Sequence, residues 1–375
     1  MTSHELLLIG ILLMAAGAPL LPTNVQKLVA TVGGFIVAAL GGTALSGFAW
    51  SWSHIPILAF LAAAAASTAF SKARKQNVVL PSVMRSDGLL TQALYVALAL
   101  LASQLAPADR ETVVRGMVWA AGFVGIVAFW QSYGAAQWAL PAGAPSEMMR
   151  TDIRACGTLA NPLFLGGYCA LMLPLVAVRA VSSAGRPEDF VVTILLSFAA
   201  VLSGSRAAWL GILAAMPIVF RDAPHPVLAA AMWICLVVIV VVGRAKFLAR
   251  ASLADVVKDS VKSSVSGRRY IWKETWSQIR QRLWIGHGFN TIIFRNPDPA
   301  ARDFYDTPHQ SVLHVWHATG AVGAACFVAV WVAAFWHAGP FLAPLVGYGI
   351  WTLLAWEHLG PSNVFWGIVG MTAAA

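Results

Sequence analysis

Long apolar runs, repeated along almost the whole chain, constrain its fold more than any other feature. Most are close in length to the roughly 20 residues that a helix needs to cross the hydrocarbon core of a bilayer. A helix of a soluble domain needs a polar face toward water, but only 11% of the 375 residues are charged and 59% are apolar. This composition excludes an ordinary soluble enzyme, a disordered chain and a fibrous protein.

The sequence therefore predicts an all-α polytopic membrane protein with about twelve transmembrane helices. Ten to twelve spans fit the pattern, because several runs are short and the two runs that flank residues 203–206 are compatible with one bent element. The twelve candidate spans are residues 6–21, 28–48, 55–70, 88–105, 113–138, 163–181, 190–204, 206–220, 226–243, 311–336, 340–356 and 363–375.

One connection is far longer than the others. Residues 244–308 hold 12 of the 25 lysines and arginines and six acidic residues, so this segment carries +6 of the net charge of +9. We expect three parts: a bundle of about nine spans in residues 1–243, the long loop at 244–308, and C-terminal spans at 309–375. In a membrane protein, such positive charge suits phosphate in lipid head groups or in a lipid-linked substrate, and nucleic acid is not an expected partner.

Part of the long loop has the pattern of an amphipathic helix. Ile271, Trp272, Trp276, Ile279 and Leu283 fall near one side of a helical wheel, and basic residues fill much of the rest. Tryptophan and arginine in this pattern are typical of a helix at a membrane surface. The helix is either an interfacial anchor alone or part of a functional site.

The charges of the short loops do not fix the orientation of the chain. One basic cluster follows the third candidate span and another follows the sixth, so the two lie on opposite sides and cannot both obey the positive-inside rule. The first cluster is Lys72, Arg74, Lys75 and Arg85, and the second is Arg179 and Arg186.

An arginine stands between two apolar runs in the stretch Leu-Ser-Gly-Ser-Arg-Ala-Ala-Trp-Leu that ends at Leu210. A charged side chain at this depth is costly and needs a reason. The small residues before Arg206 predict a break or tight turn that opens a helix. Arg206 is then either a snorkelling arginine at a span end or an anion contact at a positive helix N-terminus.

Two further motifs flank the long loop's C-terminal half. In Ser266-Gly-Arg-Arg-Tyr-Ile-Trp272, the glycine and the two arginines Arg268 and Arg269 are predicted to open the amphipathic helix, and an arginine fork suits phosphate. In Asp306-Thr-Pro-His-Gln, we expect His309 in the first turn of the next helix. A positive helix end disfavours imidazolium, so His309 is expected to stay neutral and to act as a base or a hydrogen-bond acceptor.

Other polar residues beside spans are weaker candidates. Arg154 and the helix-breaking step Asn161-Pro162 precede the sixth span, and Gly320 and Gly323 are predicted to let a helix pack closely on a neighbour. His314 and His317 are spaced to share a metal, but no carboxylate or cysteine nearby completes a site. We therefore predict no metal and no cofactor.

Taken in order, these motifs resemble the O-antigen ligase and polymerase superfamily of bacterial envelope glycosyltransferases. The matching elements lie within roughly residues 150–325 and surround one long loop between late spans. They are residues 157–162, Ser205-Arg206, Gly267-Arg268 with Trp272, Gly286-His-Gly288-Phe, and His309-Gln310-x9-Gly320-x-x-Gly323. The last form is most similar to the ligase branch, which moves O-antigen onto lipid A-core. The chain is short for the family.

The resemblance implies a multi-pass protein of the bacterial inner membrane whose long loop and active site face the periplasm. It implies inverting, metal-independent transfer of an undecaprenyl-pyrophosphate-linked glycan to a sugar hydroxyl of lipid A-core. His309, Arg268 and Arg206 are then the expected catalytic residues, and Arg154, Asn161, Arg269 and Glu357 the expected contacts to pyrophosphate or glycan. An O-antigen polymerase and a protein O-oligosaccharyltransferase acting on pilin share these motifs and remain alternatives. A transporter of lipid-linked sugars would more often show matching broken repeats.

Overall fold

The protein is helical almost throughout the part of the chain that the computed structural model describes. The described residues are 2–21, 23–42, 48–73, 88–132, 154–182, 185–221, 254–292, 294–295, 304–305, 307–355 and 359–373. The α-helices are α1 (Ser3–Leu12), α2 (Asn24–Gly42), α3 (His54–Phe70), α5 (Leu89–Ala102), α6 (Pro107–Gln131), α7 (Pro162–Val181), α8 (Pro187–Ser203), α9 (Arg206–Arg221), α11 (Ala254–Gln281), α12 (Ser311–Trp336), α13 (Leu342–Thr352) and α14 (Leu359–Ala373). Short π and 3-10 turns follow α1 (Leu13–Gly17 and Ala18–Leu20) and precede α13 (Gly339–Phe341).

Apolar helices account for most of the predicted spans. Within the described residues, α6, α7 and α12 are long and apolar enough to cross a membrane, and several shorter apolar helices accompany them. Eleven of the twelve candidate spans overlap a helix, and the candidate at residues 226–243 lies outside the described residues. The membrane character is therefore supported, and the number of spans stays a prediction.

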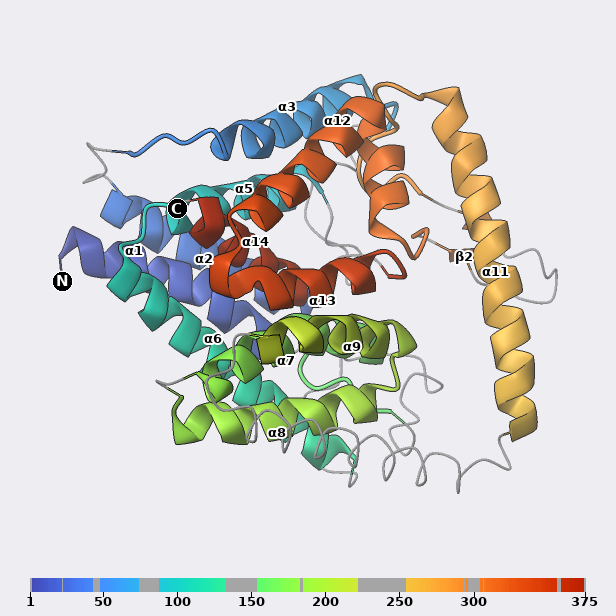
Figure 1. Cartoon of the computed structure of the whole chain (residues 1–375). Coiled ribbons are helices and arrows are strands. Elements are labelled where there is room, and N and C mark those ends of the chain that lie inside the picture. The colour runs from blue at the N-terminus through green and yellow to red at the C-terminus, as the bar shows by residue number, and fades with distance from the viewer. Residues whose placement is uncertain are drawn as a thin grey trace.

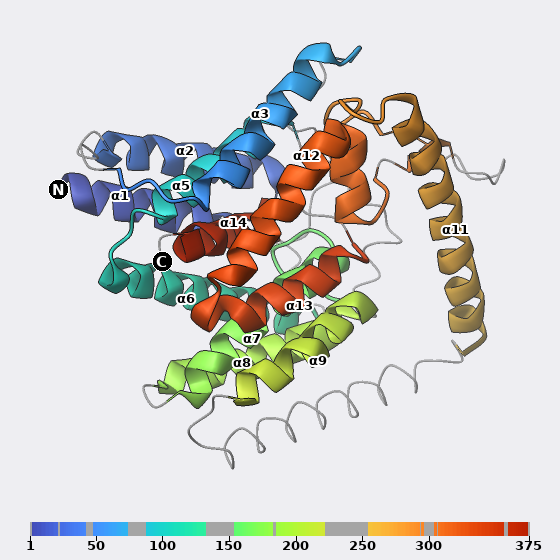
Figure 2. The same cartoon turned by 45° about the horizontal axis from the view of Figure 1, so that its top comes forward.

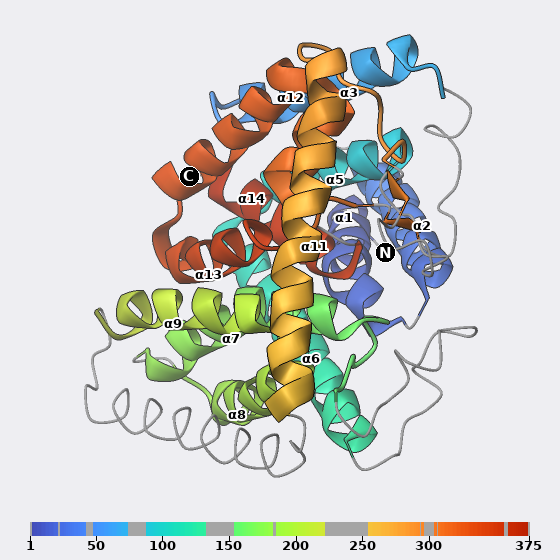
Figure 3. The ribbon, with the colours of Figure 1, turned by 90° about the vertical axis from the view of Figure 1, so that its right-hand side faces the viewer.

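Helix α11 lies across one end of the bundle. Most bundle helices run along a common direction, while α11 stands across it (Figure 1). The same relation holds after rotation (Figure 2), and α11 crosses in front of the bundle when it is viewed from that end (Figure 3). Both termini lie at the opposite end. We call these the α11 end and the far end.

The amphipathic helix is longer than predicted. It begins at Ala254, so Gly267 and Arg268 lie inside it and do not open it. The prediction was wrong because residues 254–266 are mostly polar, and they lack the apolar stripe from which the helix was recognised. Ile271, Thr275 and Ile279 form a buried stripe at helical spacing, whereas Arg269, Lys273 and Arg280 are exposed.

The long connection also contains a small β-ladder that an all-helical prediction missed. Strand β1 (Phe294–Arg295) pairs antiparallel with β2 (Phe304–Tyr305), with Phe294 opposite Tyr305. Two residues per strand are too few to leave an alternating apolar pattern in the sequence.

Helix α12 is broken at Gly320, which has φ of +72°. The segment that follows α11 inserts at this break: Ala321 N donates to Leu283 O at 2.8 Å, and His287 N donates to His317 O at 2.9 Å. A Cβ on Gly320 would lie 2.2 Å from Trp284 O, so only glycine fits. Gly320 thus admits a loop into the helix, which corrects the prediction of helix-on-helix packing for this residue. At Gly323 the prediction is confirmed, because a Cβ there would lie 3.3 Å from the Cβ of Ala63 on α3.

Candidate functional site

The turn between α8 and α9 places Arg206. Gly204 ends α8 in the left-handed conformation with φ of +60°, as glycine commonly does at a helix C-terminus. Ser205 then caps α9, because its Oγ accepts from Ala208 N at 3.4 Å. Arg206 is the first residue of α9 and its side chain is exposed. The predicted turn that opens a helix is confirmed.

Arg154 reaches the same turn from another part of the chain. Its Nε donates to Ser203 O at 2.7 Å, and the next residue's N–H donates to Leu202 O at 2.9 Å. Burial and the nearby positive charge of Arg206 lower the pKa of Arg154. Because arginine stays protonated in proteins, two like charges are held close together here.

Helix α11 brings a third arginine to this place. Arg268 is partly buried, and burial together with the charge of Arg206 lowers its pKa. One turn later on α11, Trp272 Nε1 donates to Pro308 O at 2.9 Å. This hydrogen bond joins the helix that carries Arg268 to the turn that carries His309.

His309 lies two residues before α12 and not within its first turn, so that prediction was wrong. Gln310 is the N-cap, and its side-chain oxygen accepts from Leu313 N. His309 itself adopts φ of +52°. Burial, and then the positive charge of Arg268, lower the pKa of His309 to about 4. The imidazole is therefore neutral near pH 7, as predicted, although burial and Arg268 are the causes.

The three arginines and His309 thus converge at the α11 end from four separate segments. None of the ion pairs formed by the described residues includes Arg154, Arg206 or Arg268. At the far end, by contrast, Arg179 pairs with Glu111 at 2.7 Å and with Asp189 at 3.2 Å. Clustered arginines that pair with no acidic residue in the described part of the chain suit a multiply charged anion.

The remaining predicted contacts do not all join this group. The Asn161 side-chain oxygen accepts from Leu163 N at 2.8 Å and so caps α7. Arg269 is exposed on α11, and Glu357 lies outside the described residues. The structure therefore brings together Arg154, Arg206, Arg268 and His309, which form the core of the predicted site.

A second group of histidines lies beside the break in α12. The rings of His287 and His317 stack with centroids 4.6 Å apart, and both form hydrogen bonds to Gln278. His287 Nε2 lies 2.8 Å from the backbone oxygen of Gln278, and His317 Nε2 lies 2.9 Å from its side-chain oxygen. Among the described residues, no three His, Cys, Asp or Glu side chains are placed to hold a metal ion. The stacked rings and their hydrogen bonds to Gln278 fasten the loop to α12 and α11.

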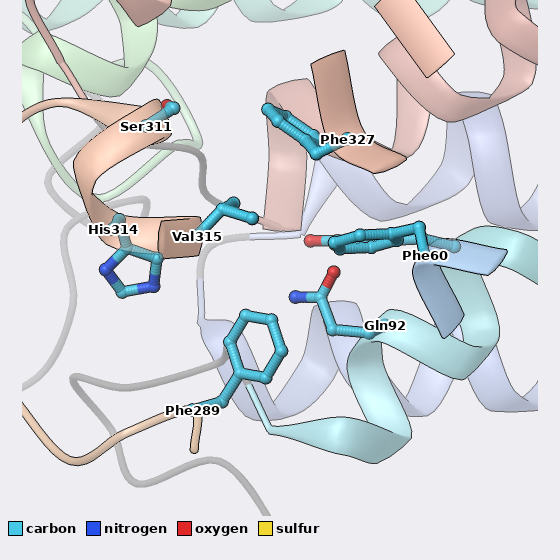
Figure 4. Close-up of a pocket in the computed structure, with 8 residues that line it drawn as sticks. Phe60, Gln92, Phe289, Ser311, His314, Val315 and Phe327 are labelled. Atoms are coloured by element: carbon cyan, nitrogen blue, oxygen red, sulfur yellow. The ribbon is translucent and has the colours of Figure 1, made fainter. Parts of the chain in front are cut away.

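His314 faces a small cavity that also involves α3 and α5. Figure 4 shows His314, Phe289 and Gln92 around a common space, with Phe60 and Phe327 also facing it. The cavity volume is about 20 Å³, which suits one or two water molecules. It is too small for a sugar ring.

Comparison with known proteins finds one family. Residues 191–328 match the family model described as O-antigen ligase. This region contains Arg206, Arg268 and His309. The resemblance to the O-antigen ligase family is confirmed. A protein named O-antigen ligase from Pseudomonas aeruginosa is 26% identical to the chain over 197 residues. That similarity covers 47% of this chain and 44% of the O-antigen ligase relative, so the chain matches less than half of the relative's length.

Two polar residues at the α11 end are absent from the sequence predictions. Lys27 directly precedes the candidate span 28–48, and Gln131 lies within the candidate span 113–138. Both side chains have 0% exposure. An ionisable or amide group in an apolar segment was the available signal, but its partners are distant in sequence and could not be predicted.

Proposed function

We propose that the chain transfers a glycan from undecaprenyl pyrophosphate to a sugar hydroxyl, as in O-antigen ligation. The observation that carries this proposal is the cluster of three arginines that form no ion pair with any described acidic residue, beside a neutral histidine. A lipid-linked pyrophosphate presents the matching chemistry: a multiply charged anion close to the membrane surface and a sugar carbon that is open to attack.

The cluster suits the departure of the pyrophosphate. As the acceptor oxygen bonds to the sugar's anomeric carbon, the bond from that carbon to the pyrophosphate oxygen breaks, and negative charge grows on the leaving group. Arg206 and Arg268 are placed to stabilise this charge, and preorganised charge of this kind lowers the barrier. Arg154 supports them. Attack from the face opposite the leaving group inverts the anomeric configuration.

His309 is proposed to take the proton from the acceptor hydroxyl. A general base must be unprotonated at the working pH, and the lowered pKa of His309 meets this condition. Burial and the nearby Arg268 keep the imidazole neutral before the reaction. The phosphates of the glycan donor offset the positive charge of Arg268 once they bind. Weaker candidates for contacts to the glycan or the pyrophosphate are Glu357, Asn161 and Arg269.

The acceptor decides among three related activities. Lipid A-core as acceptor gives O-antigen ligation, a second lipid-linked unit gives polymerisation, and pilin gives protein glycosylation. We propose lipid A-core, because the family model and the P. aeruginosa relative both carry the description O-antigen ligase. The test is to incubate the purified protein with lipid-linked glycan and each of the three acceptors. Extension of pilin or of the lipid-linked unit alone would reject ligation.

Transfer is expected to survive metal chelation. Three guanidinium groups replace the cation that many transferases use to neutralise a pyrophosphate, so excess EDTA should leave the rate of glycan transfer unchanged. The measurement compares rates with EDTA alone and with added magnesium or manganese. Loss of turnover that either metal restores would contradict this mechanism and would direct attention to Asp303 and Asp306, which both lie outside the described residues.

The α11 end is expected to face the periplasm of the inner membrane, with residues 244–308 as the periplasmic segment between the spans of 1–243 and 309–375. In a variant without its four cysteines, Lys273→Cys on the exposed face of α11 should react with an impermeant maleimide when only the outer membrane is permeabilised. Ala49→Cys, exposed at the far end, is the matched control and should react only after the inner membrane is lysed. The reverse pattern would invert the orientation.

A further inference from the structure

The segment that carries Arg154 depends on other helices for its shape. Residues 154–161 connect to α7 without regular secondary structure, and Gly157 and Ala160 have φ of +57° and +64°. Such a backbone leaves N–H and C=O groups that need partners outside the segment. These partners come from helices that are distant in sequence.

Gln131, the last residue of α6, supplies most of them. Its Oε1 accepts from Gly157 N at 2.8 Å and from Cys156 N at 3.1 Å. Its Nε2 donates to Gly157 O at 2.8 Å. One fully buried amide thus fixes both sides of the turn at Gly157.

Lys27 of α2 fixes the next residue. Its Nζ donates to Thr158 O at 3.1 Å, and the Thr158 hydroxyl donates to Pro19 O, so the chain around α2 holds the segment at two points. The Lys27 side chain has 0% exposure. Burying a lysine in a membrane bundle is costly and marks a functional position.

These hydrogen bonds restrain the segment that carries Arg154. Arg154 lies close to Arg206, and the two guanidinium groups repel each other. Two hydrogen bonds hold this part of the segment to the end of α8: Arg154 Nε donates to Ser203 O at 2.7 Å, and Ala155 N donates to Leu202 O at 2.9 Å. Neither bond removes the repulsion between the two arginines. A segment without outside anchors would relax by moving Arg154 away when the anion is absent. Anchoring keeps the cluster assembled before the donor binds, which lowers the cost of binding.

We propose that Gln131 and Lys27 are positioning residues that hold Arg154 in place for the pyrophosphate of the lipid-linked donor. This inference rests on the proposed function. It extends the site to α2 and α6, outside the region 191–328 that matches the O-antigen ligase model.

The test is a double-mutant cycle on Gln131→Met, Lys27→Met and Arg154→Ala, with undecaprenyl pyrophosphate as the binding probe. Methionine nearly conserves the volume of each side chain and removes its hydrogen bonds. A hydrogen bond to a charged group is worth about ten- to a hundredfold in affinity, so each single variant that displaces Arg154 should weaken probe affinity and raise KM for the donor by about that factor. In the Arg154→Ala background, either methionine substitution should change affinity less than about twofold.

Gln104→Met is the matched control. Gln104 clamps Ala49 in the same way, with its Oε1 accepting from Ala49 N at 2.9 Å and its Nε2 donating to Ala49 O at 3.4 Å, but at the far end. It should leave probe affinity unchanged. Equal loss from Gln104→Met, or full additivity with Arg154→Ala for both Gln131 and Lys27, would overturn the inference. If Gln131→Met fails to fold, Lys27→Met alone decides it.

The outcome also separates this inference from the proposed function. If Arg268→Lys loses probe affinity while the Gln131 and Lys27 variants keep it, only the positioning role is wrong. If none of these variants, including Arg268→Lys, changes probe affinity, the pyrophosphate site is wrong and the positioning role is rejected with it.

Discussion

His309→Ala is expected to lower glycan transfer by about a hundred- to ten-thousandfold, the range that a general base contributes. The affinity for undecaprenyl pyrophosphate should stay nearly intact, because His309 is proposed to face the acceptor hydroxyl. Transfer rates with saturating donor, together with probe binding in detergent, measure the two effects separately.

The backbone at His309 suggests a second substitution. His309 has φ of +52°, a conformation that asparagine adopts more readily than most residues. His309→Asn therefore preserves the turn and removes the base, and it should be as defective as His309→Ala. His4→Ala serves as control, since His4 is an exposed histidine at the far end that pairs with Asp109. Transfer by His309→Asn within about threefold of the unaltered protein would reject the role of base.

The same residue sets the expected pH dependence. Histidine ordinarily titrates near pH 6.5, but burial and Arg268 lower the pKa of His309 to about 4. A base works when it is unprotonated, so kcat/KM should stay level as the pH falls from about 8 to about 5 and should drop only as it falls through the lowered pKa. A drop centred near pH 6.5 would show that His309 is not held neutral in this way.

Local patterns in the sequence predict the segments that form this site but not the tertiary contacts between these segments. The Ser-Gly-Ser stretch before Arg206 predicts a turn that opens a helix, because glycine and serine have specific roles at helix ends. Arg154 and Ser203 are 49 residues apart, and their hydrogen bond arises from tertiary packing. The resemblance to the family motifs predicts that Arg206, Arg268 and His309 lie in one site. Their spacing in the sequence alone does not predict this.

The wrong predictions share a physical cause. The predicted start of α11 is wrong because the first residues of this helix lack the apolar stripe. The predicted role of Gly320 is wrong because a pair of small residues in a span usually indicates close packing of two helices. Here the carbonyl of Trp284 occupies the space beside Gly320. In the sequence, a glycine is the only sign of a loop that inserts into a helix. Lys27 and Gln131 were missed for the related reason that each satisfies backbone groups of a remote segment.

Arg268→Lys is expected to lower transfer by about a hundred- to a thousandfold, even though it keeps the charge. Lysine is a point charge, whereas the guanidinium fork binds two phosphate oxygens at once. One lost contact of this kind to the developing charge of a transition state is worth about 2.7–4 kcal/mol. Rates of glycan transfer at saturating acceptor give the size of the loss.

Arg268 and His309 should differ in how they affect donor binding. Arg268 is proposed to contact the pyrophosphate before the reaction as well as during it, so Arg268→Lys should weaken affinity for undecaprenyl pyrophosphate, whereas His309→Ala should not. Lys273→Arg, on the exposed face of the same helix, is the matched control and should change neither quantity. The two residues have different neighbours: Arg268 lies close enough to Arg206 for their charges to interact, whereas the charge that acts on His309 is that of Arg268, and His309 lies next to α12. The assignment of roles is wrong if His309→Ala loses donor affinity while Arg268→Lys retains both affinity and turnover.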